Sequence, residues 1–187
     1  MKQQPRHDTR ERILAVAGRL FATKGYDDTS LLEIAKEVGV KKASLYYFFR
    51  DKEAMFAAVA EKVWDDMEQT AKQLRNEAMR AGKDEREVFA HILEAVIRHT
   101  IDAGNVMIRM QQMAHGGGLH SRAARKVTSM RKMLKDFLVR KKVREPDIAE
   151  NVIINSIQGY VVHRRCGASR VSIAKYSQHL SSLFFKK

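Results

Sequence analysis

Two short helical segments separated by one glycine constrain the fold of this chain more than any other feature. In TSLLEIAKEVGVKKASLYYFF, residues 29–49, apolar side chains recur at helical spacing and Gly39 interrupts them. Ser30 followed by Glu33 is the capping pattern of a helix start, and a glycine is a typical C-terminal stop. A further helix must then begin near Lys41, so the stretch predicts a helix-turn-helix.

The remainder of the chain also favours helices. It has 187 residues and two prolines, with neither an alternating strand pattern nor an internal repeat. Caps, glycine breaks and apolar spacing predict an all-α fold of about nine helices, beginning near residues 8, 30, 41, 51, 84, 106, 120, 146 and 171. We expect a helix-turn-helix domain over 1–52 and a larger helical domain over 53–187, with the boundary near Lys52 to Met55.

Charge and cysteine content narrow the functional classes. The formal net charge of +13 and the pI near 10.0 favour polyanionic partners, with nucleic acid first and anionic lipid or an acidic ligand behind it. The single cysteine, Cys166, predicts a reduced cytosolic thiol. The start MKQQPRHDTRER lacks the apolar core of a signal peptide, and no apolar run is long enough for a transmembrane segment. We therefore expect a cytoplasmic protein.

The first turn of the second motif helix has the side chains that a DNA groove requires. A helix in the major groove needs small or polar residues where it meets base edges, and donors around it for phosphates. We expect Leu45 and Phe49 to be core residues. The candidate DNA-facing residues are Lys41, Lys42, Ala43, Ser44, Tyr46, Tyr47 and, at the start of the next helix, Lys52.

The stretch from Arg12 to Ala58, RILAVAGRLFATKGYDDTSLLEIAKEVGVKKASLYYFFRDKEAMFAA, resembles the N-terminal DNA-binding domain of the TetR family of repressors. The resemblance implies that Thr29 and Ser30 lie at the phosphate-facing start of the second helix. It also implies that Lys42, Ala43, Ser44, Tyr46, Tyr47 and Lys52 meet DNA. Two positions depart from the family pattern. Leu32 replaces a frequently polar residue and offers only an apolar contact to a thymine methyl, and Phe48 removes a phosphate hydrogen bond.

The same resemblance implies a homodimer that binds a palindromic double-stranded operator and releases it when a small-molecule effector enters the C-terminal helical region. The last two helices would form the dimer surface and the fourth helix would act as the lever. The candidate interface residues are Val152, Ser156, Gly159, Tyr160, His163, Leu180 and Phe184. Ordinary intrachain core is the alternative for this set.

An apolar or amphipathic effector would need a cavity lined by apolar side chains. The candidate lining residues are Phe89, Ile92, Val96, Met107, Met110, Met113, Met130, Met133 and Phe137. Methionine adapts to irregular apolar ligands, but a methionine stripe at helical spacing is equally typical of a core. His91, His99 and His115 could orient a polar group of the ligand, or could be solvated or satisfied in the core.

A basic run over residues 122–144 has ten basic residues and one acid, a local charge of +9, whereas residues 1–52 carry only +4. A solvated helix face, an anionic effector such as an acyl-coenzyme A, and contact with acidic lipid are three interpretations. The alternative function is a nonspecific nucleic-acid or membrane-surface protein that acts through this run. Catalytic motifs are not recognisable, and Gly116 to Gly118 read as a hinge and not as a phosphate loop, so we expect no enzyme, no cofactor and no metal.

Overall fold

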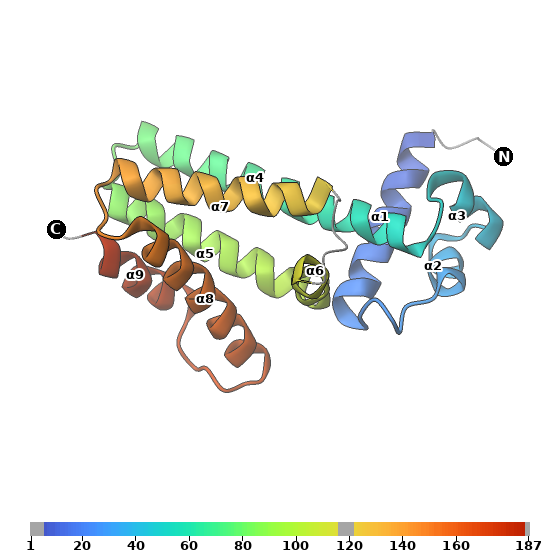
Figure 1. Ribbon diagram of the computed structural model, residues 1–187. Coiled ribbons are helices and arrows are strands. Elements are labelled where there is room, and N and C mark those ends of the chain that lie inside the picture. The colour runs from blue at the N-terminus through green and yellow to red at the C-terminus, as the bar shows by residue number, and fades with distance from the viewer. Residues whose placement is uncertain (1–5, 116–121, 186–187) are drawn as a thin grey trace. The chain divides into compact units, whose positions relative to one another are not determined.

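The fold is entirely helical over residues 6–115 and 122–185, the parts that the computed structural model describes. Nine helices occur in these ranges (Figure 1): α1 Arg6–Thr23, α2 Leu31–Val38, α3 Lys42–Phe48, α4 Lys52–Arg80, α5 Glu85–Ala103, α6 Asn105–His115, α7 Arg122–Arg140, α8 Pro146–Arg165 and α9 Ile173–Phe184. The all-α prediction is therefore confirmed. The predicted hinge at Gly116 to Gly118 and the helix start at residue 120 lie outside the described residues.

The chain forms two compact units, each of which consists of two separate stretches of the sequence. Unit 1 comprises Met1–Trp64 and Asp102–Arg125, and unit 2 comprises Asp65–Ile101 and Lys126–Lys187. Helix α4 passes from unit 1 into unit 2, and α6 belongs to unit 1 although it follows α5 of unit 2. The expected division at residues 52 and 53 falls at the start of α4. The compact units are divided at other positions, after Trp64, Ile101 and Arg125. The division into a DNA-binding domain and an effector-binding domain therefore stays a prediction.

Unit 1 is built on the buried face of α1. Ile13, Ala17 and Phe21 are completely buried there, as their spacing along the helix predicts. Phe21, Tyr26 and Phe56 form a cluster of rings with centroids 5.2 to 5.7 Å apart. Helices α2 and α6 both pack against α1, and α3 packs against α2. The core of unit 1 therefore joins the helix-turn-helix to the first turns of α4.

Helix α6 is fastened to the C-terminal end of α1 by close contacts. The Asn105 side chain donates a hydrogen bond to the Thr23 carbonyl over 3.1 Å. A Cβ atom added to Gly104 would lie only 2.6 Å from the Ala22 carbonyl oxygen, so the two backbones approach as closely as a glycine permits. Gly104 also has a φ of +51°, which side-chain-bearing residues rarely adopt.

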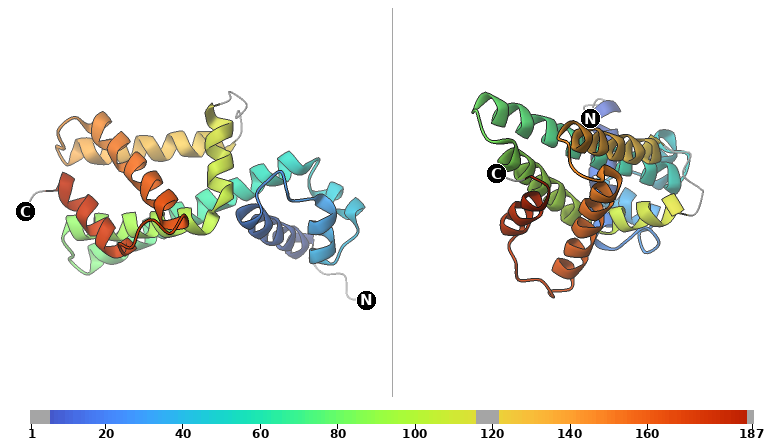
Figure 2. Two further views of the ribbon diagram at one scale, coloured as in Figure 1. Left: turned by 90° about the horizontal axis from the view of Figure 1, so that it is seen from below. Right: turned by 60° about the vertical axis from the view of Figure 1, so that its left-hand side comes forward.

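Unit 2 has its own apolar core, to which α5, α7, α8 and α9 contribute. Ile97, Leu138 and Ile153 are almost completely buried in it. Phe89 stacks on Phe137 with ring centroids 5.4 Å apart. The C-terminal end of α9 lies beside the N-terminal end of α5 (Figures 1 and 2), where the Ser181 hydroxyl donates to the Arg86 carbonyl over 2.8 Å. The α7–α9 region thus closes onto α5 within one unit.

At least four of the ten basic residues in the 122–144 run form intramolecular ion pairs. Arg131 contacts the buried carboxylate of Glu150 at 2.7 Å, and Lys135 contacts Asp147 at 2.5 Å. Lys126 pairs with Asp65 on α4, and Lys141 pairs with Glu85 on α5. The side chain of Arg122 lies outside the described residues. These four residues therefore neutralise acids of the neighbouring helices, whereas Lys132, Arg140, Lys142 and Arg144 are exposed.

None of the helices in the described ranges combines the length and the apolar character needed to cross a membrane.

Candidate nucleic-acid interface

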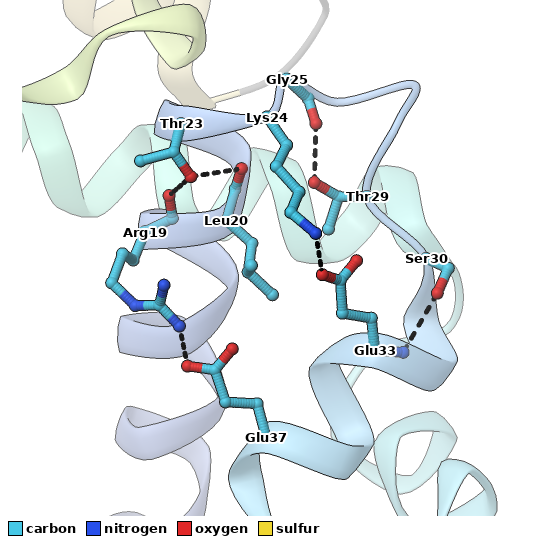
Figure 3. A network of polar contacts seen from close by, with 9 residues as sticks. All are labelled: Arg19, Leu20, Thr23, Lys24, Gly25, Thr29, Ser30, Glu33 and Glu37. Atoms are coloured by element: carbon cyan, nitrogen blue, oxygen red, sulfur yellow. Dashed lines mark hydrogen bonds and ion pairs between the residues drawn. The ribbon is translucent and has the colours of Figure 1, made fainter.

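Helix α2 is placed against α1 by caps and ion pairs (Figure 3). The Ser30 hydroxyl accepts a hydrogen bond from the Glu33 N–H over 3.0 Å, which confirms the predicted N-cap. The Glu33 carboxylate pairs with Lys24, and Glu37 pairs with Arg19, so this side of α2 faces α1. The Lys24 hydrogen bond is the main cause that lowers the pKa of Glu33.

Thr29 has a different position from the one that the family resemblance implies. Its side chain is only 1% exposed, and its hydroxyl donates to the Gly25 carbonyl over 2.7 Å (Figure 3). A buried hydroxyl with a protein partner cannot contact a phosphate, so the expectation of direct DNA contact is wrong for the Thr29 side chain. Thr29 instead shapes the loop that leads to Ser30, which is exposed as expected.

Helix α3 presents its polar and small residues to solvent. Gly39 ends α2 in the left-handed conformation, with a φ of 80°, and Lys41 is the N-cap residue of α3. Leu45 and Phe49 are buried, as predicted, and hold the helix on unit 1. The exposed residues are Lys41, Lys42, Ala43, Ser44, Tyr46 and Tyr47, every α3 candidate for DNA contact. Tyr46 is 50% and Tyr47 65% exposed, although both are large rings.

The lysines of α3 are electrostatically unfavourable where they stand. The N-terminus of a helix carries a partial positive charge, so cations are disfavoured there and anions are favoured. Lys41 and Lys42 occupy this end of α3, and its first turn has no acidic residue. A phosphate partner would relieve the repulsion, which is one physical reason to regard this surface as an anion-binding surface.

Lys52 is held at the start of α4 by an aromatic ring. Its Nζ lies 4.3 Å from the centroid of Tyr26 and 3.4 Å from the Asp27 carbonyl oxygen. Arg109 of α6 also lies over the Tyr26 ring, 4.9 Å from its centroid, and contacts the Asp27 carboxylate at 3.9 Å. Burial, followed by the Glu53 carboxylate, raises the pKa of Tyr26. The α1–α2 loop, α4 and α6 thus meet at one tyrosine.

Asp51 begins α4 as predicted. Its carboxylate accepts a hydrogen bond from the Ala54 N–H over 2.7 Å and one from the Arg50 side chain over 2.8 Å. These two bonds, the backbone bond first, lower the pKa of Asp51. The cap fixes the direction in which α4 leaves the helix-turn-helix.

The candidate effector-lining residues are distributed over both units. Phe89 is buried in unit 2, where Val96 and Phe137 pack against the same core. Ile92 and Met130 are partly buried in unit 2, whereas Met107 is partly buried and Met110 fully buried in unit 1. The side chain of Met113 lies outside the described residues, as does that of His115. Met133 is 45% exposed, which contradicts its expected place in a cavity wall.

The histidines that could orient a ligand have nearby protein partners. His91 is exposed, and its Nδ1 lies 2.8 Å from the Glu87 carbonyl oxygen. The His99 Nε2 lies 3.2 Å from the Thr70 hydroxyl. Across the described residues, no group of three or more His, Cys, Asp or Glu side chains could hold a metal ion.

Three of the expected interface residues belong to the intrachain core. Tyr160 is 5% exposed, stacks on Tyr176 and donates its hydroxyl proton to the Val171 carbonyl. Leu180 is 3% exposed, and Phe184 packs against the core of unit 2. The family resemblance predicts an interface for these residues because they lie on the last two helices, but for these three the structure shows the alternative, burial within the same chain.

The outer face of α8 has an exposed stripe instead. Gly159 and His163 are exposed, Ser156 is half-buried, and Val152 is 41% exposed, as an interface would require. Ile148 and Val162, which the sequence prediction did not include, lie on the same side of the helix with 57% and 54% exposure. Ile148 lies four residues before Val152, and Val162 lies three residues after Gly159; this helical spacing was the signal that could have identified them.

Comparison with known proteins shows which family the N-terminal segment resembles. A profile described as "Bacterial regulatory proteins, tetR family" matches residues 13–59, the segment that forms most of unit 1. Residues 13–59 therefore resemble the DNA-binding segment of TetR-family regulators. Tyr26 and Lys52 lie inside the matched segment, whereas Arg109, which contacts the same ring, lies beyond it.

Two curated TetR-type relatives match parts of the chain. It is 34% identical over 100 residues to the HTH-type transcriptional regulator AcrR of Shigella flexneri, a match that spans 51% of this chain and 45% of AcrR. It is 49% identical over 47 residues to IcaR of Staphylococcus aureus strain Newman, the negative transcriptional regulator of the biofilm operon icaADBC, over 25% of each protein. The matches therefore span about half of AcrR and a quarter of IcaR.

A solved structure extends the likeness to the C-terminal helices. FadR of Bacillus subtilis, in complex with stearoyl-CoA, superposes with a TM-score of 0.70 and 18% identity over 92% of this chain and 96% of that chain. At this identity the match shows a common fold.

Proposed function

We propose that this protein is a TetR-family transcriptional repressor, a homodimer that binds a palindromic DNA operator through α2 and α3 and is released by a small-molecule effector. The observation that supports DNA binding best is the surface of α3. Lys42, Ala43, Ser44 and Tyr47 are exposed on a short helix that buried Leu45 holds in place. Small and polar side chains on a rigidly supported helix suit insertion into a major groove.

A second copy of the chain would pair through the outer face of α8 and the neighbouring α9. Two recognition helices must reach successive major-groove segments about 34 to 36 Å apart, which requires a symmetric dimer. The exposed stripe of Ile148, Val152 and Val162 around exposed Gly159 supports this surface, because glycine permits close approach of a second helix.

The effector would be apolar or amphipathic. FadR, which has the same fold, binds stearoyl-CoA in its crystal structure. Phe89, Val96 and Phe137 provide apolar surface in unit 2. Only Gly104 separates α5 from α6, and Arg109 of α6 contacts Tyr26 and Asp27 in the loop before α2. A ligand that displaces these helices would therefore change the DNA-binding surface.

The proposal is tested by incubating the purified full-length chain with a random-duplex library at near-physiological salt and sequencing the retained DNA. We expect recovery of a palindrome with two half-sites. Retention of DNA without a consensus would show that the protein binds DNA nonspecifically through its positive charge, and it would refute the repressor proposal.

The dimer surface has a separate test. We expect Val152→Glu to reduce the molar mass in solution from that of a dimer toward that of a monomer, since a buried carboxylate would lack a partner. Ser129→Glu, at an exposed position of α7, is the matched control and should leave the mass unchanged. An unchanged mass in both variants would place the interface elsewhere.

A further inference from the structure

We infer that Leu32 reads the C5-methyl group of a thymine in each operator half-site, so that α2 as well as α3 determines sequence preference. This inference rests on the proposed function and names the chemistry of one position within it. Leu32 is 64% exposed, close to the value for Tyr47 and larger than that for Tyr46. Unlike the two tyrosines, it has no polar atom in its side chain.

The direction of Leu32 follows from the contacts of its neighbours on α2. Ile34 is completely buried in unit 1, and residues two apart on an α-helix differ in direction by about 200°. Leu32 therefore points away from the core. Glu33, between them, pairs with Lys24, the residue that follows α1. The Leu32 side of α2 is thus the side turned away from both the core and α1.

An exposed leucine is common on protein surfaces and by itself indicates nothing. The place of Leu32 distinguishes it from Met79, which is 69% exposed at the end of α4. Leu32 lies on the first helix of the helix-turn-helix, only two residues after the exposed N-cap Ser30. When such a motif binds DNA, the second helix lies in the major groove and the first helix crosses the backbone beside it, so the outward sides of both helices meet DNA.

The major groove contains one apolar group for such a side chain. Guanine, cytosine and adenine present hydrogen-bond donors and acceptors there, and only thymine presents a methyl group. Placing Leu32 against any other base edge would desolvate polar atoms without giving them a hydrogen bond, which is unfavourable. Contact with a thymine methyl removes apolar surface of both groups from water and leaves no polar atom without a partner.

The expected effect is modest and measurable. Burial of one methyl group contributes about 0.8 kcal/mol, which corresponds to a change in Kd of about 4-fold. A dimer on a palindrome makes the contact twice, so removing both methyl groups should weaken binding about 15-fold.

The test uses the duplex recovered by library selection with the full-length chain. Each thymine pair of the palindrome is replaced in turn by deoxyuridine, which lacks only the C5-methyl group, and Kd is measured by fluorescence anisotropy at fixed salt. For the unmodified chain we expect one symmetric thymine pair whose replacement weakens binding about 15-fold. For Leu32→Ala the same replacement should have no effect, whereas Leu32→Met should retain most of the response.

Met79→Ala is the matched control, since it removes an equally exposed apolar side chain outside the helix-turn-helix. It should respond to deoxyuridine as the unmodified chain does, and thermal melts of each variant establish that it is folded. A deoxyuridine response that persists in Leu32→Ala, or a palindrome in which no thymine replacement matters, would overturn the Leu32 inference and leave the repressor proposal intact. Failure to recover any palindrome would overturn both.

Discussion

Replacing Gly104 by alanine should destabilise the protein more than an ordinary glycine substitution, because it separates α6 from α1. Gly104 has a φ of +51°, where an L-amino acid costs about 1 kcal/mol. The new Cβ would also lie 2.6 Å from the Ala22 carbonyl oxygen, which is backbone and cannot rotate away. Relieving that overlap costs a further 1 to 3 kcal/mol or so in typical overpacked sites.

Gly82, in the turn between α4 and α5, is the matched control for this substitution. Its φ is +62°, similar to that of Gly104, but an added Cβ would meet nothing within 4 Å. Gly82→Ala therefore isolates the cost of the backbone conformation, about 1 kcal/mol. The difference between the two variants measures the cost of the α1–α6 contact.

Thermal unfolding followed by circular dichroism gives the comparison directly. For a chain of this length, 1 kcal/mol corresponds to a shift in Tm of about 2 to 4 °C. We expect Gly82→Ala to lower Tm by roughly that amount and Gly104→Ala to lower it by about 6 to 12 °C. Equal shifts in the two variants would refute the close α1–α6 contact and the fixed position of α6 on unit 1.

Three other predictions have defined outcomes. Ser30→Ala and Ser172→Ala each remove an N-cap, and each should lower the free energy of unfolding by about 1 kcal/mol. Only Ser30→Ala should also weaken duplex binding. If both variants bind the duplex equally weakly, α2 has no specific role in DNA binding. The lowered pKa of Asp51 means that its stabilisation is present above its ordinary pKa of 3.8 and is lost as pH falls through the lowered value. The difference in Tm between the unmodified chain and Asp51→Asn should therefore shrink under acid, and a pH-independent difference would contradict this. Arg131→Met leaves the 6% exposed Glu150 without its guanidinium and should cost about 2 to 3 kcal/mol by chemical denaturation, part of which Glu150→Gln should restore in the double variant.

The local features of unit 1 could be predicted from the sequence because their causes are local. The Ser30 cap, the Gly39 stop and the burial of Leu45 depend on residues within a few positions of each other. The exposure of the α3 residues around Leu45 could be predicted from the helical spacing of the apolar residues. The burial of Thr29 was not predicted, because its assignment came from the family resemblance, which does not include its hydrogen bond to the Gly25 carbonyl.

Contacts between distant segments could not be predicted in the same way. Asn105 and Thr23 are 82 positions apart, and the sequence contains no signal that pairs them. Periodicity indicated that Tyr160 and Leu180 are buried, but it does not distinguish burial in the same chain from burial against a second copy. The charge of the 122–144 run was likewise visible, whereas its pairing with Asp65, Glu85 and Glu150 depends on the packing of α4, α5 and α8.

The most direct test of the central claim is the ratio of two dissociation constants for the full-length chain at one near-physiological salt concentration. One is for the duplex recovered by selection, and the other is for a duplex of the same composition in scrambled order. A sequence-specific regulator should bind the selected duplex at least about 10³-fold more tightly. A ratio near one would show that binding is due to charge alone and would contradict the assignment of α2 and α3 as a sequence-reading surface.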